Sequence, residues 1–298
     1  MKRMTEARNS ATTHIDTMTT SEILTVINQQ DQKVPQAIAQ KEVLQAITQV
    51  VDTVVDCLKN GGRLFYTGAG TSGRLGILDA AECVPTYGTD PELVQGLIAG
   101  GPSAMTDAVE GAEDSKEGGA LDLKNRHLTA QDFVLGIAAS GTTPYVIGGL
   151  DYANSIGAHT GALSCNRNSL IGQHAQVAIE AEVGPEVVTG STRMKAGTAE
   201  KLILNMISTT TMIKLGKVYG NLMVDVKPTN IKLVDRAQRI ISEATGVDAK
   251  TAEKYYEASH HQPKVAIVMI NGDCDYPTAN EALTTNQGFI AAALKALR

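Results

Sequence analysis

Between residues 63 and 183 the sequence repeats one pattern: a short apolar run, a glycine-rich turn and a helical segment. The apolar runs predict five strands, at 64–67, 93–98, 133–138, 158–165 and 177–183. Strands that alternate with helices form a parallel sheet, because each crossover helix returns the chain to the same edge. The chain has no Trp and only three Phe, so its core must be aliphatic, which suits strands buried on both faces. The predicted fold class is α/β, with a doubly wound parallel sheet flanked by helices.

The residues before this repeat predict helices. Thr19-Thr20-Ser21-Glu22 fits a capping box, which opens a helix through about Asp31. A longer helix begins at Val34-Pro35 and ends near Asn60, ahead of Gly61-Gly62. Its apolar residues recur every three or four positions and form one stripe, for packing on the sheet or on a partner subunit: Leu44, Ile47, Val51, Val54 and Leu58.

Helices replace strands after Thr198. The sequence predicts helices at 199–215, 229–244 and 249–259, followed by shorter pieces that Pro263 and the turn residues 271–277 separate. We therefore predict three parts: an N-terminal arm with helices (1–60), the α/β domain (61–228) and a small helical C-terminal unit (229–298).

Charge and composition argue against several classes of protein. The 26 basic and 32 acidic residues give a net charge of −6, without the basic stripe of a nucleic-acid-binding surface. The apolar runs are shorter than the roughly 18–20 residues of a membrane span. A secretory signal requires an apolar region after its basic residues, and no such region follows the basic N-terminus here. The four cysteines form no CxxC pair, and the six histidines form no HExxH motif. We expect a cytosolic protein without a metal site.

The first glycine-rich turn, Gly68-x-Gly70-x-x-Gly73, follows a predicted strand and precedes a helix. This spacing fits a dinucleotide-binding loop, but the next strand ends in Ala99-Gly100-Gly101 and lacks the acidic residue that binds the ribose. The turn also carries Thr71 and Ser72, whose hydroxyl groups suit phosphate or sugar oxygens. The N–H groups and the positive dipole end of the following helix favour such an anion.

A second turn of this design, Ser140-Gly141-Thr142-Thr143-Pro144, follows the third strand. In a parallel sheet both turns lie at the carboxyl edge, where α/β proteins bind ligands. The alternative is that these hydroxyl groups only cap helices. A third segment, 184–198, contains Arg193 and Lys195 before a long helix; these cations either steer an anionic substrate or belong to an ordinary capped loop.

Taken together, these segments resemble the sugar isomerase (SIS) phosphosugar-binding fold, and more closely the N-acetylmuramic acid 6-phosphate etherases. The resemblance rests on GAGTSGRLGILDAAEC (68–83), AVEGAEDS (108–115), AASGTTPY (138–145) and GPEVVTGSTRMKAGTAEKL (184–202), and extends to TEARNSATTHID (5–16). It implies the cleavage of N-acetylmuramic acid 6-phosphate by water to N-acetylglucosamine 6-phosphate and D-lactate. It also implies a homodimer that needs no metal or organic cofactor.

The resemblance assigns roles to individual residues. Glu82 matches the acid that protonates the departing lactate, and burial in the apolar run around it would raise the pKa of its carboxyl group. Glu113 matches the base that removes the proton from C2 of the open-chain sugar. Glu110 would share its face of a helix predicted at 103–117 and bind the sugar. The expected phosphate and sugar ligands are Thr71, Ser72, Ser140 and Thr143, with Lys195 assisting.

The residues taken alone allow different roles. Glu110 and Glu113 fit a solvated acidic face, and Glu82 fits a surface position. A vertebrate glucokinase regulatory protein shares these segments, so a phosphosugar-binding regulator is one alternative, although this chain has a single copy of the GTSG loop. A phosphosugar isomerase, which also needs a base at C2, is a second. A nicotinamide dehydrogenase is the least consistent, because the acidic residue after the second strand is missing. The sequence does not determine which glutamate is the acid and which is the base.

Overall fold

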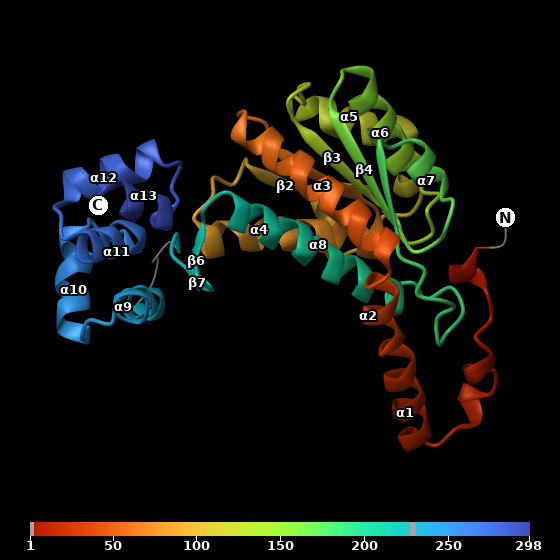
Figure 1. Cartoon of the computed structure of the whole chain (residues 1–298). Coiled ribbons are helices and arrows are strands. Elements are labelled where there is room, and N and C mark those ends of the chain that lie inside the picture. The colour runs from red at the N-terminus through yellow and green to blue at the C-terminus, as the bar shows by residue number, and fades with distance from the viewer. Residues whose placement is uncertain (1–2, 227–230) are drawn as a thin grey trace. The chain divides into compact units, whose positions relative to one another are not determined.

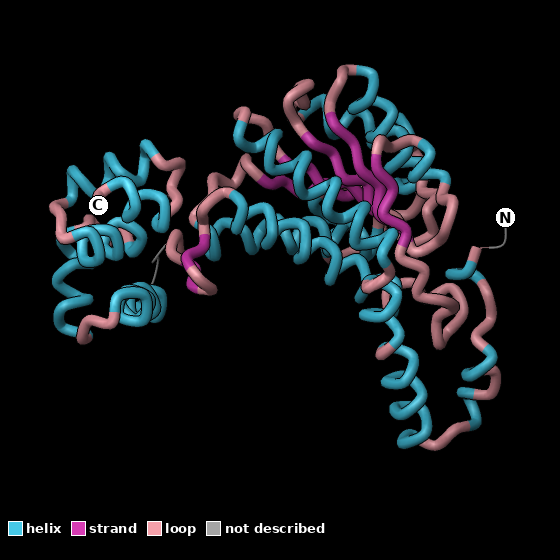
Figure 2. The backbone as a smooth tube through the Cα atoms, viewed as in Figure 1, coloured by secondary structure: helices cyan, strands magenta, loops and turns pink. Residues whose placement is uncertain are grey.

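The structure, a computed structural model, describes residues 3–226 and 231–298. Its centre is a parallel sheet of five strands in the order β2-β1-β3-β4-β5, seen as one magenta layer in Figure 2. The strands are β1 Leu64–Gly68, β2 Val94–Ile98, β3 Phe133–Ile137, β4 His159–Ser164 and β5 Val177–Glu180. Each neighbouring pair is parallel. The predicted fold class and the five predicted strands are confirmed, with ends that differ by up to three residues.

Helices cover both faces of this sheet (Figure 1). Phe65 of β1 packs with apolar residues of α6 (Pro144–Ser155), which lies on one face with α5 (Lys116–Asn125) and α7 (Leu170–Gln173). The next side chain, Tyr66, points to the other face, because successive strand residues alternate. There its hydroxyl group donates to Asp79 of α4 (Gly70–Tyr87) at 2.9 Å. This second face carries α3 (Lys41–Lys59), α4 and α8 (Lys195–Lys214).

The N-terminal residues form an arm and helices that pack in the same compact unit as the sheet. The arm contains three 3-10 turns, Met4–Glu6, Ser10–Thr12 and Ile15–Thr17. The predicted capping box of Thr19 and Glu22 is present at the start of α1 (Thr20–Asp31). The long helix expected from Val34 to Asn60 is instead two helices, α2 (Lys33–Ile38) and α3. Its apolar stripe is buried on α3 except at Leu44, which is exposed.

The helix predicted at 103–117 is wrong. The segment holds two short 3-10 turns, Pro102–Met105 and Ala112–Asp114, and α5 begins only at Lys116. Gly111, inside the predicted range, has a φ of +73°, which interrupts a right-handed helix, and Gly100 and Gly101, just ahead of that range, have φ values of +88° and +72°. Glu110 and Glu113 therefore do not share a helix face. They lie on a loop whose course is set by these glycines.

The C-terminal residues form a helical unit with an apolar core of its own. Its helices are α9 (Ile231–Thr245), α10 (Ala249–Ala258), α11 (Pro263–Gly272), α12 (Tyr276–Thr285) and α13 (Ile290–Ala296). They pack through small and aliphatic side chains such as Ala237, Ile241 and Val268. A small hairpin of β6 (Val218–Tyr219) and β7 (Leu222–Met223) precedes them. The start predicted for the first of these helices, Thr229, lies outside the described residues.

The described chain divides into two compact units. One consists of the residues up to Ala81 together with Glu92–Ser208, and the other of Glu82–Pro91 together with the residues from Thr209 onward. This division differs from the boundaries predicted at 60/61 and 228/229, because the N-terminal helices pack on the sheet and α8 runs from one unit into the other. Within the described ranges, no helix is long and apolar enough to cross a membrane.

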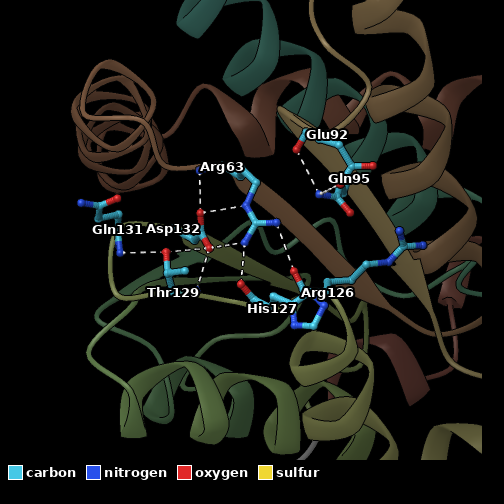
Figure 3. A network of polar contacts seen from close by, with 8 residues as sticks. All are labelled: Arg63, Glu92, Gln95, Arg126, His127, Thr129, Gln131 and Asp132. Atoms are coloured by element: carbon cyan, nitrogen blue, oxygen red, sulfur yellow. Dashed lines mark hydrogen bonds and ion pairs between the residues drawn. The ribbon is translucent and has the colours of Figure 1, made fainter.

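A buried ion pair holds the amino edge of the sheet, where β1 and β3 begin (Figure 3). The Asp132 carboxylate is fully buried and accepts hydrogen bonds from the Arg63 backbone and guanidinium, the closest at 2.8 Å. It also accepts from the backbone N–H of Thr129 at 2.8 Å. Arg63 donates onward to the carbonyls of Arg126 and His127. The polar groups that fix the start of these two strands are therefore mutually satisfied, at the edge opposite the glycine-rich turns.

Candidate functional site

The topology of the sheet places a crevice at the carboxyl ends of β1 and β3. These strands are neighbours, but their following helices, α4 and α6, cover opposite faces, so the chain diverges there. β1 ends at Gly68, where an added Cβ would lie 2.8 Å from the backbone nitrogen of Gly73. Only glycine allows this close approach of strand and helix. The two hydroxyl-rich turns consequently meet at one edge.

Between these turns lies a cavity of about 370 Å³, which we call the hydroxyl cavity. It brings together four predicted ligands, Thr71, Ser72, Ser140 and Thr143, and the predicted base Glu113. The remaining residues that line it are Arg3, Glu6, Ala69, Gly70, Asp114, Ala138, Ala139, Thr142, Pro144 and Thr192. The sequence-based pairing of the two turns in one site is thus realised in the structure.

The second turn places polar groups at the N-terminus of α6. The Ser140 hydroxyl lies 3.3 Å from the Thr142 hydroxyl and accepts from the Thr142 N–H at the same distance. Thr143 occupies the N-cap position of α6, yet its side chain makes no capping hydrogen bond. Pro144 is the first helical residue, where a missing N–H costs nothing. The Thr143 hydroxyl and the first N–H groups of α6 can therefore serve a ligand.

The N-terminal arm contributes a cation to the hydroxyl cavity. Arg3 lines it and donates from Nη1 to the Thr142 hydroxyl at 3.4 Å. Asn166 holds the arm in place, because its Oδ1 accepts from the backbone N–H of Met4 at 2.7 Å. The amide nitrogen of Asn166 donates to the Thr5 hydroxyl and to the carbonyl of Ser140. The arm and the second turn are thus joined through one buried side chain.

A second cavity, of about 250 Å³, adjoins the first; we call it the acidic cavity. Glu113 lines both cavities, together with Ala69 and Gly70. Glu110 lines only the acidic cavity. Arg74 of α4 holds this loop by donating to the carbonyls of Met105 at 3.0 Å and Asp107 at 3.2 Å. A ligand anchored in the hydroxyl cavity can therefore extend past Glu113 toward Glu110.

Glu82 does not belong to this group. It is exposed on α4, so the burial that we expected around Ala80, Ala81 and Cys83 is wrong at this position, because the helix turns Glu82 away from the buried Ala80 and Cys83. Glu82 follows Gly70 by twelve residues along α4. A rise of about 1.5 Å per residue puts it roughly 18 Å along the helix from the hydroxyl cavity. Among the described residues that line the two cavities, Glu82 is absent.

The third segment is held by its own contacts. The buried Glu186 carboxylate accepts from the backbone N–H groups of Lys195 and Ala196 at 3.0 and 2.9 Å, and so occupies the N-terminus of α8. Lys195 is 1% exposed and donates from Nζ to the carbonyl of Val183 at 3.0 Å. Burial lowers the pKa of this ammonium group. The structure does not bring Lys195 into the hydroxyl cavity, and Arg193 is exposed.

Behind the first turn lies a carboxyl group that no sequence motif singles out. Glu200 of α8 is fully buried, and its Oε1 accepts a hydrogen bond from the Ser72 hydroxyl at 2.7 Å. Desolvation by burial raises the pKa of Glu200 to about 8, and the hydrogen bond from Ser72 opposes this change. One of the two oxygens of this carboxyl group is thus in direct contact with a residue that lines the hydroxyl cavity.

No group of three or more His, Cys, Asp or Glu side chains within residues 3–226 and 231–298 is arranged to hold a metal ion. Cys57, Cys83 and Cys165 are buried free thiols, and Cys274 is a partly buried one. The polar groups that converge on the two cavities are hydroxyl groups, carboxylates, the guanidinium groups of Arg3 and Arg74, and two helix N-termini. Such a set suits an anionic, hydroxylated small molecule.

Comparison with known proteins identifies the family to which the chain belongs. Its residues 46–154 match the family described as "Glucokinase regulatory protein N-terminal SIS domain". The chain is 60% identical to the N-acetylmuramic acid 6-phosphate etherase of Exiguobacterium sp., over 98% of this chain and 99% of that one. It belongs to the N-acetylmuramic acid 6-phosphate etherase family. The etherase of Oenococcus oeni is 58% identical, with 98% of both chains covered.

The etherase family assignment agrees with the fold. The solved structure of the protein c3406 from E. coli CFT073 matches with a TM-score of 0.51 and 13% identity, over 68% of this chain and 97% of that one. At this identity the likeness concerns the SIS-type fold alone. The family resemblance inferred from the sequence motifs is therefore confirmed.

Sequence reasoning missed four residues of this site. Arg3 and Asn166 were not selected because their partners lie 139 and 162 positions away in the chain. Arg74 was not selected because its sequence context indicates only a helix. Its hydrogen bond to the carbonyl of Met105 depends on the loop that the structure has in place of the helix expected at 103–117. Glu200 lies within the segment 184–202, but nothing in the sequence distinguishes a buried glutamate from an exposed one in an amphipathic helix.

Proposed function

We propose that this protein is a carbon–oxygen lyase that cleaves N-acetylmuramic acid 6-phosphate to N-acetylglucosamine 6-phosphate and D-lactate. The family membership supports the substrate class. The observation that carries the proposal is the position of Glu113, which borders both the hydroxyl cavity and the acidic cavity. A single carboxylate there can act on a sugar whose phosphate is held on one side.

The phosphate group is best accommodated in the hydroxyl cavity. Thr71, Ser72, Ser140 and Thr143 line it, and the N-termini of α4 and α6 open beside it. Each N-terminus carries about half a positive charge. Arg3 adds a guanidinium group, which matches the geometry of phosphate oxygens. The sugar carbons would then lie near Glu113, with the lactyl group toward the acidic cavity.

The chemistry follows from the open-chain form of the sugar. Its C1 aldehyde makes the proton at C2 acidic, and Glu113 takes this proton as the base. The C3–oxygen bond to lactate then breaks, and an acid supplies a proton to the departing oxygen. In the addition, Glu113 returns its proton to C2, and water adds its hydroxyl group to C3 and gives its proton back to the acid, so that one water is consumed for each lactate released. A positioned acid or base contributes typically 10²–10⁴-fold to such a step.

Glu82 is our candidate for the acid, through its match to the family motif. Because it is exposed and roughly 18 Å along α4 from the hydroxyl cavity, it would reach the sugar from a second copy of the chain. We therefore include a homodimer in the proposal, with each site completed by the partner subunit. An enzyme that acts on a phosphorylated sugar belongs in the cytoplasm, where such phosphate esters are held.

The proposal is tested by supplying N-acetylmuramic acid 6-phosphate in heavy-oxygen water. We expect D-lactate without the label and N-acetylglucosamine 6-phosphate that carries the label at C3. Label in the hydroxyl group of lactate would instead mean attack on the lactyl carbon and would contradict the elimination. A product isomerised at C1 and C2 without lactate would identify a phosphosugar isomerase.

The role of Glu113 is tested in the same assay. Glu113→Gln keeps the size of the side chain but removes the base, so lactate release should fall about 10²–10⁴-fold. Glu117→Gln is the matched control, because Glu117 is an exposed residue of α5 that lines neither cavity. Full activity of the Glu113 variant, measured by lactate release, would remove this residue from the mechanism.

A further inference from the structure

Glu200 has an environment that is unusual for a carboxyl group. It lies on α8 with no exposed surface, and its Oε1 is 2.7 Å from the Ser72 hydroxyl oxygen. Its other oxygen, Oε2, is also buried and has no hydrogen-bond partner within the described chain. A buried ionised carboxylate normally requires a cation or several donors. Here a single serine hydroxyl faces it.

The neighbouring ionisable groups do not supply the missing charge. The Cys165 thiol lies in the same region, and its pKa is raised by burial first and then by Glu200 and Glu186, so it stays neutral. Glu186 is engaged with the N-terminus of α8. The Lys195 ammonium group donates to the carbonyl of Val183 and, at 3.4 Å, to the side chain of Gln30. Burial therefore favours a protonated Glu200, and its pKa is raised to about 8.

The proton on Glu200 decides what Ser72 can do. A serine hydroxyl has one hydrogen to donate and lone pairs that accept. An ionised Glu200 can only accept, so the Ser72 hydrogen points into the protein and lone pairs face the hydroxyl cavity. A protonated Glu200 can donate from Oε1 to Ser72 Oγ, which releases the Ser72 hydrogen for the cavity. Only the second arrangement suits an anion, because phosphate oxygens accept hydrogen bonds.

We propose that Glu200 is a positioning residue that holds a proton and thereby turns the Ser72 hydroxyl toward the phosphate group of the ligand. The inference rests on the proposed function, since it takes Ser72 as a phosphate ligand. Phosphate binding would then be coupled to retention of one proton by Glu200, which never touches the ligand. Loss of that proton at higher pH leaves the fold intact, but the Ser72 hydroxyl then presents lone pairs, and not its hydrogen, to the phosphate group.

The coupling has a measurable consequence for affinity. Sugar phosphates lose their second proton near pH 6, so the ligand has a constant charge above about pH 7. Binding of N-acetylglucosamine 6-phosphate, measured by calorimetry, should weaken as the pH rises through about 8. The loss approaches about tenfold per pH unit above that value if only the protonated form binds. The KM for the substrate should rise in the same range, with little change in kcat.

Glu200→Gln tests the assignment, because the glutamine amide donates to Ser72 at every pH. We expect this variant to bind N-acetylglucosamine 6-phosphate between about pH 7 and 9.5 with the affinity that the wild-type protein has at about pH 7. Ser72→Ala should bind weakly at all pH values, and Glu200→Gln should add nothing in that background. Glu253→Gln, which removes an exposed charge on α10, should retain the wild-type profile.

Two results would overturn the inference while leaving the proposed function in place. The first is that the affinity of Glu200→Gln for N-acetylglucosamine 6-phosphate changes with pH as the wild-type affinity does. The second is that the affinity of Glu200→Gln does not change with pH but is as weak as that of Ser72→Ala. A wild-type protein that binds no N-acetylglucosamine 6-phosphate at neutral pH and releases no lactate would overturn the proposed function itself. Thermal unfolding of each variant at neutral pH verifies that the proteins compared are folded.

Discussion

Buried carboxyl groups make the stability of a protein depend on pH. Glu200 illustrates this at the scale of one residue, because burial raises its pKa in the folded protein to about 8, above its ordinary value of 4.5. The folded state therefore holds a proton that the unfolded chain has released between these two values. Protonation of Glu200 therefore stabilises the folded state. This contribution is fully present below about pH 4.5 and is lost as the pH rises through about 8.

Glu200→Gln should remove this dependence. The neutral amide avoids desolvating a charge, so the variant should gain stability over the wild-type protein by up to about 1.4 kcal/mol per pH unit within that window. Melting temperatures measured from about pH 5 to 9 give the comparison, and the difference should level off above about pH 8. Parallel curves for the two proteins would show that the pKa of Glu200 is not raised in the folded state.

At this scale the sequence located the hydroxyl groups but not their partners. Ser72, Ser140 and Thr143 were found because turn residues that follow strands are recognisable from short motifs. Arg3 and Glu200 were missed because their contacts, with Thr142 and Ser72, join residues 139 and 128 positions apart. The expected burial of Glu82 failed for a related reason. Apolar neighbours in the sequence do not determine which face of a helix is covered.

At the scale of the elements, the two ends of β1 and β3 have different roles: the amino ends stabilise the sheet and the carboxyl ends lead into the candidate site. Their amino ends are fixed by Arg63 and the fully buried Asp132, and their carboxyl ends lead into the turns of the hydroxyl cavity. The strands were predictable within a few residues because apolar runs bounded by glycine leave few alternatives. The loop at 102–115 was not, because positive φ at glycine outweighs a helix-compatible pattern.

Asp132→Ala should separate stability from ligand binding. It leaves the Arg63 guanidinium without its buried partner, a loss that typically costs about 3–5 kcal/mol. We expect a clear drop in melting temperature, while the affinity for N-acetylglucosamine 6-phosphate at a temperature where the variant is folded stays near the wild-type value. An affinity loss as large as that of Ser72→Ala would show that the two ends of the strands are coupled.

For the whole molecule, the position of Glu82 bears on the assembly. If each site combines Glu113 of one subunit with Glu82 of the other, a dimer of one Glu82→Gln and one Glu113→Gln chain keeps one intact site. Co-expression of the two inactive variants with different affinity tags gives such mixed dimers. Random pairing makes half of the dimers mixed, so the pool should regain about a quarter of wild-type lactate release. If both glutamates of a site came from one chain, mixing would restore nothing.

The N-terminal arm also affects the order in which the site is built. The arm is held by Asn166 and by the carbonyl of Val187, which are translated 162 and 175 positions after their partners in the arm. A nascent chain therefore lacks the guanidinium side of the hydroxyl cavity until most of the protein has been translated.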